Sequence, residues 1–216
     1  MKGLLIKDMK LMKNMRNSIV MILLIAVGMG SYLKDGSFLI VYLSLIGATF
    51  TTSTLSYDEF DNGYSFLFSL PVTRKSYVIE KYCFGLLLSG GGWLLGTGIA
   101  GAAGVARNMA SLTDSIVMAL MMIPIPLILL AVLLPLHFKF GGEKSRIVMV
   151  GIMGGLFAIV MAAVKILEML HLDLGVLENL QLKGMGAAAA AGAALGALLL
   201  LLSCRISMGI MEKKEF

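Results

Sequence analysis

Residues 115–136 read SIVMALMMIPIPLILLAVLLPL, a run of 22 residues without one ionisable side chain. A helix that crosses a bilayer needs about 20 mostly apolar residues, so this stretch predicts a transmembrane helix. The sequence predicts an all-α membrane protein with six transmembrane helices in a single transmembrane domain, residues 1–216. The five further stretches that qualify or nearly qualify as spans are 18–33, 37–56, 82–106, 147–167 and 185–204.

The composition excludes a soluble globular protein, a disordered chain and a disulfide-stapled secreted module. Hydrophobic residues make up 58% of the 216 residues and charged residues 14%, against about a quarter charged in ordinary soluble domains. Two cysteines and two distant histidines match no metal-ligand spacing, so we expect neither a metal site nor a cofactor. No catalytic motif occurs, so we do not expect an enzyme. The net charge of +5 is modest and does not indicate a nucleic-acid partner.

Lysines and arginines predict the orientation, because the cytoplasmic loops of membrane proteins carry an excess of them. Fourteen of the 18 fall on one side of the predicted topology: in the N-terminal tail, in the loops after the second and fourth spans, and at the C-terminus. The other four are Lys34, Arg107, Lys165 and Lys183. We therefore predict that both termini and the two basic loops are cytoplasmic, in a protein of the cell membrane.

The predicted spans contain almost no ionisable residues, and Lys165, near the outer end of the fifth, is the exception. Proton- and sodium-coupled carriers usually place a carboxylate or a charge relay inside the bundle. The sequence therefore disfavours a secondary transporter and indicates that energy enters from outside the membrane domain. A bundle without buried charge suits an apolar or amphipathic substrate.

Small residues in two spans predict close helix packing. Gly92 and Gly96 lie four residues apart in the third span, and Gly192 and Gly196 lie four apart in the sixth. Such spacing lets helix backbones approach closely. The sequence leaves open whether this packing joins helices of one chain or of two subunits.

Three prolines interrupt the fourth span. Pro124 and Pro126, at its centre, each remove a backbone donor. They predict a kink or an unwound turn, which is tolerated where it is buried in protein or lines a transport pathway. Pro135, near the cytoplasmic end, is a candidate terminator of the same helix.

Two segments predict helices that lie on the membrane surface. Residues 1–16 place leucine and methionine on one side and lysine on the other, as in an interfacial helix whose lysines lie near anionic lipid, although Asp8 falls on the apolar side. Residues 168–184 carry too much charge to span a membrane but enough leucine to lie at the outer interface.

The cytoplasmic segment 57–81, YDEFDNGYSFLFSLPVTRKSYVIEK, is the best candidate for a docking surface. It breaks at Leu70-Pro71, after which Thr73 is a candidate cap for a second helix. Exposed aromatic residues beside the membrane are typical of a docking surface, and an amphipathic segment lying on lipid is the alternative. Its acidic and aromatic residues before the break are Asp58, Glu59, Phe60, Asp61, Tyr64, Phe66 and Phe68.

Three motifs give the chain a family resemblance. They are the opening MKGLLIKDMKLMK, the stretch FSLPVTRKSYVIEKY after the second span, and PLHFKFGGEKSR after the fourth. With six spans and no fused ATPase, the chain resembles the small permeases of ATP-binding cassette type-2 exporters. It looks most like the short permeases that export amphipathic peptides, including the phenol-soluble modulin exporters.

The resemblance implies a bacterial type-2 exporter permease with an N-terminal interfacial helix. It implies a second permease subunit, identical or different, and two copies of a separate ATPase subunit. Residues 58–68 would form the coupling helix that docks on the ATPase, with Pro71, Arg74 and Lys75 shaping the turn behind it. A membrane immunity or sensor protein that acts by binding alone is the alternative function.

Overall fold

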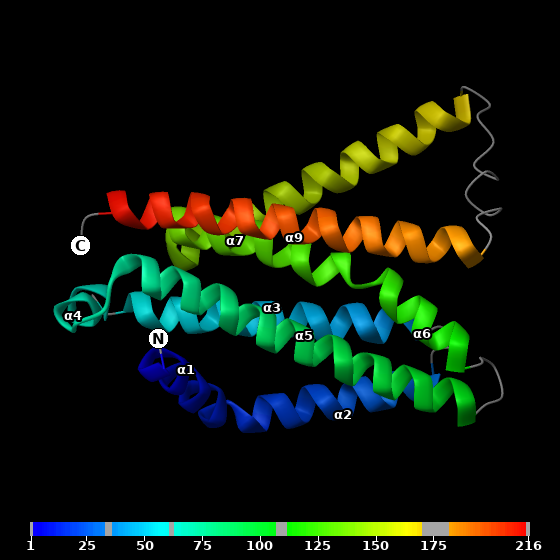
Figure 1. Cartoon of the computed structure of the whole chain (residues 1–216), viewed down its shortest axis with the longest axis horizontal. Helices are drawn as coiled ribbons and strands as arrows, with labels where there is room; N and C mark the ends of the chain where they lie inside the picture. Colours follow the sequence, from blue (N-terminus) through cyan, green and yellow to red (C-terminus); the bar gives the residue numbers. More distant parts are fainter. Residues whose placement is uncertain (1, 33–35, 61–62, 107–111, 170–181, 215–216) are drawn as a thin grey trace.

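The computed structural model describes residues 2–32, 36–60, 63–106, 112–169 and 182–214, which form α-helices and no strand (Figure 1). The helices pack side by side into a bundle, in which α3 packs chiefly against α5 and α7 against α9. The helices are α1 (Lys2–Asn14), α2 (Arg16–Tyr32), α3 (Ser37–Glu59), α4 (Gly63–Ser69), α5 (Arg74–Ala106), α6 (Leu112–Met121), α7 (Pro124–Met169) and α9 (Leu182–Lys213).

Four helical segments of the described chain are long and apolar enough to cross a membrane: Ser37–Glu59, Arg74–Ala106, Ser115–Gly142 and Ala189–Lys213. Helices α1 and α2 add a fifth if the bent pair counts as one span. These segments confirm an all-helical, multi-pass arrangement. The six spans remain a prediction; the stretch predicted as the fifth, 147–167, lies in the second half of α7, which is helical to Met169.

Glycine determines how closely α3 and α5 approach each other. A Cβ atom added to Gly92 would lie 2.3 Å from the backbone oxygen of Leu43, and one added to Gly96 would lie 2.7 Å from the Cα atom of Ile40. Neighbouring Gly90 has open space instead. The glycine spacing of the third span thus serves packing within one chain, because only a residue without a side chain admits the backbone of α3 there.

The prolines of the fourth span separate α6 from α7. Helix α6 ends at Met121 and α7 begins at Pro124, where a first-turn proline loses no intrahelical hydrogen bond. The ring of Pro124 also packs against α9, since its Cγ atom would lie 2.9 Å from a Cβ atom added to Gly192. A Cβ atom added to Gly196 would lie 3.2 Å from Leu127 of α7. The start of α7, directly after the break, therefore packs against the small residues of the sixth span.

The prediction that Pro135 ends the helix is wrong. Helix α7 continues through Pro135, and the backbone leaves the helical conformation at Gly141, with φ 76° and ψ 174°. A positive φ costs glycine little, so the glycine and not the proline sets the turn. The second half of α7 runs back from this turn and diverges from α9 (Figure 1).

The N-terminus of α1, the C-terminal end of α9 and α4 lie at the same end of the bundle, which we call the α4 end (Figure 1). Helix α1 makes an angle of 67° with α2, so Lys2–Asn14 turns away from the line of the following helix. The geometry agrees with two termini on one side of a membrane, and the cytoplasmic assignment remains a prediction. Within the predicted outer segment 168–184, residues 170–181 lie outside the described part of the chain.

Candidate functional site

The predicted cytoplasmic segment 57–81 is mostly helical. The last turn of α3 extends to Glu59, α4 is a separate two-turn helix, and α5 begins at Arg74, well before the predicted span. The predicted cap is confirmed, because the Ser76 backbone N–H donates to the Thr73 hydroxyl at 3.2 Å. The segment therefore turns back on itself, and α4 is held between two long helices.

One side of α4 is buried in an aromatic cluster. Tyr64 and Leu67 are buried, and Phe68 is half-buried. The ring of Tyr77 on α5 lies 5.9 Å from the Tyr64 ring and 5.8 Å from the Phe68 ring, both edge-on, and 6.2 Å from the ring of Phe138 on α7. Such edge-to-face pairs stabilise beyond their buried area. Burial raises the pKa of the Tyr64 hydroxyl, and the charge of Glu59 adds to the effect, so Tyr64 stays neutral.

The other side of α4 and its flanks expose large apolar side chains. Phe66 is 72% exposed and Phe60, directly after α3, is 73% exposed. Leu70 and Pro71, which follow α4, are exposed as well. Phe66 and Phe68 thus face opposite ways: Phe66 faces outward and Phe68 faces into the helical bundle. Asp61 lies outside the described residues.

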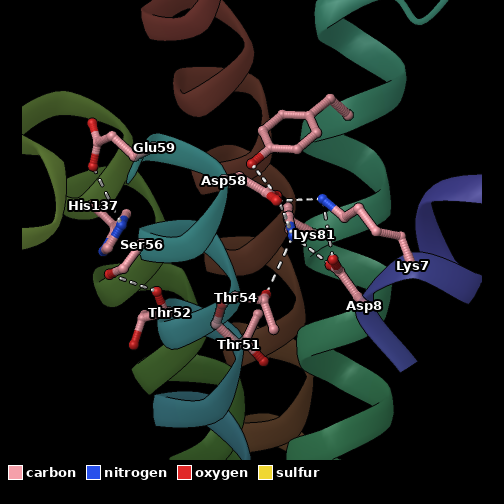
Figure 2. A network of polar contacts seen from close by, with 11 residues as sticks. Lys7, Asp8, Thr51, Thr52, Thr54, Ser56, Asp58, Glu59, Lys81 and His137 are labelled. Atoms are coloured by element: carbon pink, nitrogen blue, oxygen red, sulfur yellow. Dashed lines mark hydrogen bonds and ion pairs between the residues drawn. The ribbon is translucent and has the colours of Figure 1, made fainter. Parts of the chain in front are cut away.

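Asp58 does not face outward but is buried between α1 and α5 (Figure 2). Its carboxylate accepts a hydrogen bond from Lys7 of α1, lies 2.8 Å from the Lys81 ammonium of α5, and accepts a hydrogen bond from the Tyr77 hydroxyl at 2.9 Å. Removing a charged group from water is costly unless it is paired. These donors balance that cost and tie the end of α3 to two other helices.

Asp8 explains the irregularity in the amphipathic pattern of the first helix. Its carboxylate is fully buried and pairs with Lys81, which also donates to the Thr54 hydroxyl at 3.2 Å (Figure 2). The side of α1 that carries Asp8 therefore faces the bundle and not the membrane. Glu80 is also buried, at 1% exposed, and neither of its carboxylate oxygens has a hydrogen-bond partner in the described part of the chain.

Glu59 faces the opposite side of α3 from Asp58 (Figure 2). Its carboxylate accepts a hydrogen bond from the Gly142 backbone N–H at 2.7 Å, directly after the turn in α7, and pairs with the ammonium of Lys214 at 3.1 Å. Backbone N–H groups at the start of a helix favour a negative charge. Adjacent carboxylates at the end of α3 thus contact α1 and α5 on one side and α7 and the chain after α9 on the other.

Arg74 and Lys75 hold the C-terminal end of α9. The Arg74 guanidinium donates to the backbone oxygens of Met211, Glu212 and Lys214 at 3.0, 2.8 and 2.8 Å. A cation that bonds the last carbonyls of a helix also interacts favourably with its dipole. Lys75 pairs with the Glu212 carboxylate at 3.1 Å, where both groups are exposed.

The structure thus divides the residues singled out in the sequence. Phe60, Phe66 and Pro71 lie on the surface, whereas Asp58, Glu59, Tyr64, Phe68 and Arg74 contact other helices. The sequence patterns did not predict the buried ion pairs. The position of Asp8 on the apolar side of a helix was the one sign that a buried cation faces it. In the described residues no group of three or more histidine, cysteine, aspartate or glutamate side chains could hold a metal ion.

Comparison with known proteins identifies the family. The family model described as "ABC-2 family transporter protein" matches residues 3–212. No curated protein and no solved structure matches the chain. The match covers nearly the whole chain, and it agrees with the apolar helices and with the resemblance of the three sequence motifs. The chain belongs to the ABC-2 transporter family, in which it is a multi-pass membrane permease.

Proposed function

We propose that this permease is the membrane subunit of an ATP-driven exporter and that a separate ATPase subunit docks on α4. ABC-2 permeases generally work with an ATPase subunit. The observation that carries the proposal is the asymmetry of α4: Tyr64 and Phe68 anchor it in the bundle, while Phe66 remains 72% exposed at the end of the molecule. An exposed aromatic side chain on a rigid element is a typical anchor of a protein interface.

The contacts behind α4 supply a route for transmitting movement. Helix α4 follows α3 closely, and α3 ends in Asp58 and Glu59. Asp58 is linked to α1 and α5, and Glu59 to the turn in α7 and to Lys214 after α9. A displacement of α4 by nucleotide-driven closure of the ATPase would therefore reach both sides of the bundle at once. Two such permeases, identical or different, and two ATPase subunits would rock between inward- and outward-facing states.

The distribution of charge supports an apolar or amphipathic cargo, of which amphipathic peptides are one class. In the four described candidate spans, all charged side chains lie toward the α4 end. The remaining length of these spans offers a cargo only uncharged side chains. We place the exporter in the cell membrane of a bacterium, with the α4 end in the cytoplasm, on the strength of the basic residues gathered at that end.

Purification of the tagged permease from its native cells tests the docking site. The ATPase should co-purify with the wild type, whereas Phe66→Ala should weaken docking by about thirtyfold, the equivalent of roughly 2 kcal/mol for an interface hot spot. Phe38→Ala, at the other end of α3, is the matched control, because Phe38 is also an exposed phenylalanine, at 46%.

The result separates docking from folding. Phe66→Ala should lose both the ATPase and export while its abundance in the membrane stays normal. Retention of the ATPase and of full export by Phe66→Ala and by the Phe60→Ala/Phe66→Ala double variant would place the docking surface elsewhere. A chain that never associates with an ATPase would favour the immunity or sensor function.

A further inference from the structure

A groove lies at the bend between α1 and α2, on the side of α1 away from the bundle. Leu4 and Asp8, on the inner side of α1, are buried. The groove has a volume of about 580 Å³, within the range of roughly 300–1,000 Å³ that is usual for small-molecule sites. The residues that line it are Ile6, Met9, Lys10, Met12, Lys13, Arg16, Ile19 and Val20.

The groove combines an apolar floor with a cationic rim. Its apolar lining comes from isoleucine, methionine and valine, and no acidic residue contributes to it. Lys10, Lys13 and Arg16 are exposed, and none of them forms an ion pair with the described residues. Lys7, on the same helix, differs because it is paired with Asp58. Three positive charges are thus left available beside an apolar surface.

We propose that this groove binds an anionic phospholipid of the leaflet on the α4 side. The cations would bind the phosphate of the headgroup, and an acyl chain would lie along Ile19 and Val20, where α2 continues into its apolar stretch. Charge complementarity favours a negatively charged amphiphile, because basic side chains attract anionic lipid and the apolar floor gives no advantage to a free phosphate.

The bend gives this site a structural consequence. The lining residues come from both arms of the 67° bend, so one bound lipid contacts α1 and α2 together. On the opposite side of α1, Asp8 pairs with Lys81 of the bundle. A lipid in the groove would therefore stabilise the angle between α1 and α2, and with it the position of α1 against α5.

Native mass spectrometry of the purified full-length permease in neutral detergent tests the proposal. The probes are dioctanoyl phosphatidylglycerol, dioctanoyl phosphatidylcholine and glycerol phosphate, which carries the phosphate without acyl chains. We expect phosphatidylglycerol to bind on the order of a hundredfold more tightly than phosphatidylcholine, because each of the three cations contributes about fivefold. Glycerol phosphate should not compete.

Variants assign the binding to the groove. The triple variant Lys10→Gln/Lys13→Gln/Arg16→Gln should lose the preference for phosphatidylglycerol, by about fivefold for each cation removed. The matched control Lys139→Gln/Lys144→Gln/Lys213→Gln removes three exposed cations elsewhere at the α4 end and should retain it. The single variant Arg16→Gln, with an expected loss of about fivefold, provides the same test if the triple variant does not fold.

Several results would overturn the lipid site. They are equal losses in the two triple variants, competition by glycerol phosphate, or tighter binding of an acidic amphipathic peptide than of phosphatidylglycerol, which would make the groove a cargo site. The experiment contains neither ATPase nor ATP, so its failure would leave the proposed exporter function untouched.

Discussion

At the scale of single residues, the ion pair between Asp8 and Lys81 is the feature that most distinguishes the α4 end. Both side chains are fully buried although 73 positions separate them in the sequence. A buried pair adds little net stability compared with apolar residues, but the loss of one partner leaves an uncompensated charge in the interior. This asymmetry makes the pair testable.

Lys81→Gln and Asp8→Asn should each destabilise the permease by about 3 kcal/mol, the lower end of the range for breaking a buried pair, because Lys81 keeps Asp58 at 2.8 Å and Asp8 keeps Lys7 at 3.4 Å. The double variant should cost less than the sum of the two. Unfolding of the four proteins in mixed micelles with increasing denaturing detergent measures these differences. Lys75→Gln, which breaks an exposed pair, is the control and should cost about 1 kcal/mol or less. Singles that cost no more than this control would contradict the assigned burial.

The buried Glu80 and the half-buried Glu59 provide a second contrast, between two carboxylates with different partners. Glu59→Gln should cost about 1.5–3 kcal/mol, because the Gly142 N–H and Lys214 lose a charged acceptor. Glu80→Gln should leave stability unchanged or raise it, because the Glu80 oxygens have no hydrogen-bond donor in the described structure and the amide removes a buried charge. The same unfolding measurement tests both, and a larger loss for Glu80→Gln than for Glu59→Gln would show that Glu80 has a partner.

At the scale of helices, we propose that the break between α6 and α7 serves movement or the shape of the transport pathway more than folding. Replacing Pro124 and Pro126 with alanine restores two backbone donors and should join the two helices into one. Transport should fall while the amount of protein in the membrane stays near the wild-type level. Pro135→Ala is the control, since α7 already continues through Pro135. Parallel loss of protein and transport would make the two prolines purely structural.

The helices were predictable from the sequence, but their contacts and, apart from the start of α5, their ends were not. Apolar runs indicate where helices must be, and Thr73 signals the start of α5. Hydropathy cannot show that α5 begins at Arg74, before the predicted span. A buried charge such as Lys81 resembles a loop residue until its partner is known. The sequence predicts that Pro135 ends the helix, yet the helix continues to Gly141, since a proline is tolerated within a helix whose surroundings satisfy the freed carbonyl.

The candidate site was predictable in position but not in orientation. The spacing of Phe66 and Phe68 indicates that they cannot share one side of a helix. Only the fold shows that Phe68 packs on Tyr77 and that Phe66 faces outward. Asp58 is next to the aromatic residues in sequence, but the lysines that pair with its carboxylate come from α1 and α5. Contacts between positions so far apart are not contained in any local pattern.

At the scale of the whole molecule, the basic residues predict that the α4 end is cytoplasmic. In a variant without Cys83 and Cys204, a membrane-impermeant thiol reagent applied outside the cell should label cysteine at position 32, because Tyr32 lies at the far end of α2 and is 93% exposed. It should not label cysteine in place of Lys144, just beyond the turn in α7. The reverse pattern would invert the topology and exclude an ATPase at α4.

The end of α3, just before α4, contacts both sides of the bundle: Asp58 pairs with Lys81 of α5, and Glu59 accepts a hydrogen bond from Gly142 of α7. The α4 end thus brings together the charges of the four candidate spans, the aromatic cluster and the exposed side chains of Phe60 and Phe66. We propose that an ATPase subunit binds at this end.

The most direct test places a photoreactive phenylalanine analogue at position 66 in the full-length permease and irradiates living cells. We expect a covalent adduct between the permease and an ATP-binding subunit at position 66, much less of it at position 68, and none at position 38 at the other end of α3. Absence of the adduct at position 66, or an equal yield at position 38, would contradict the claim that α4 is the docking site.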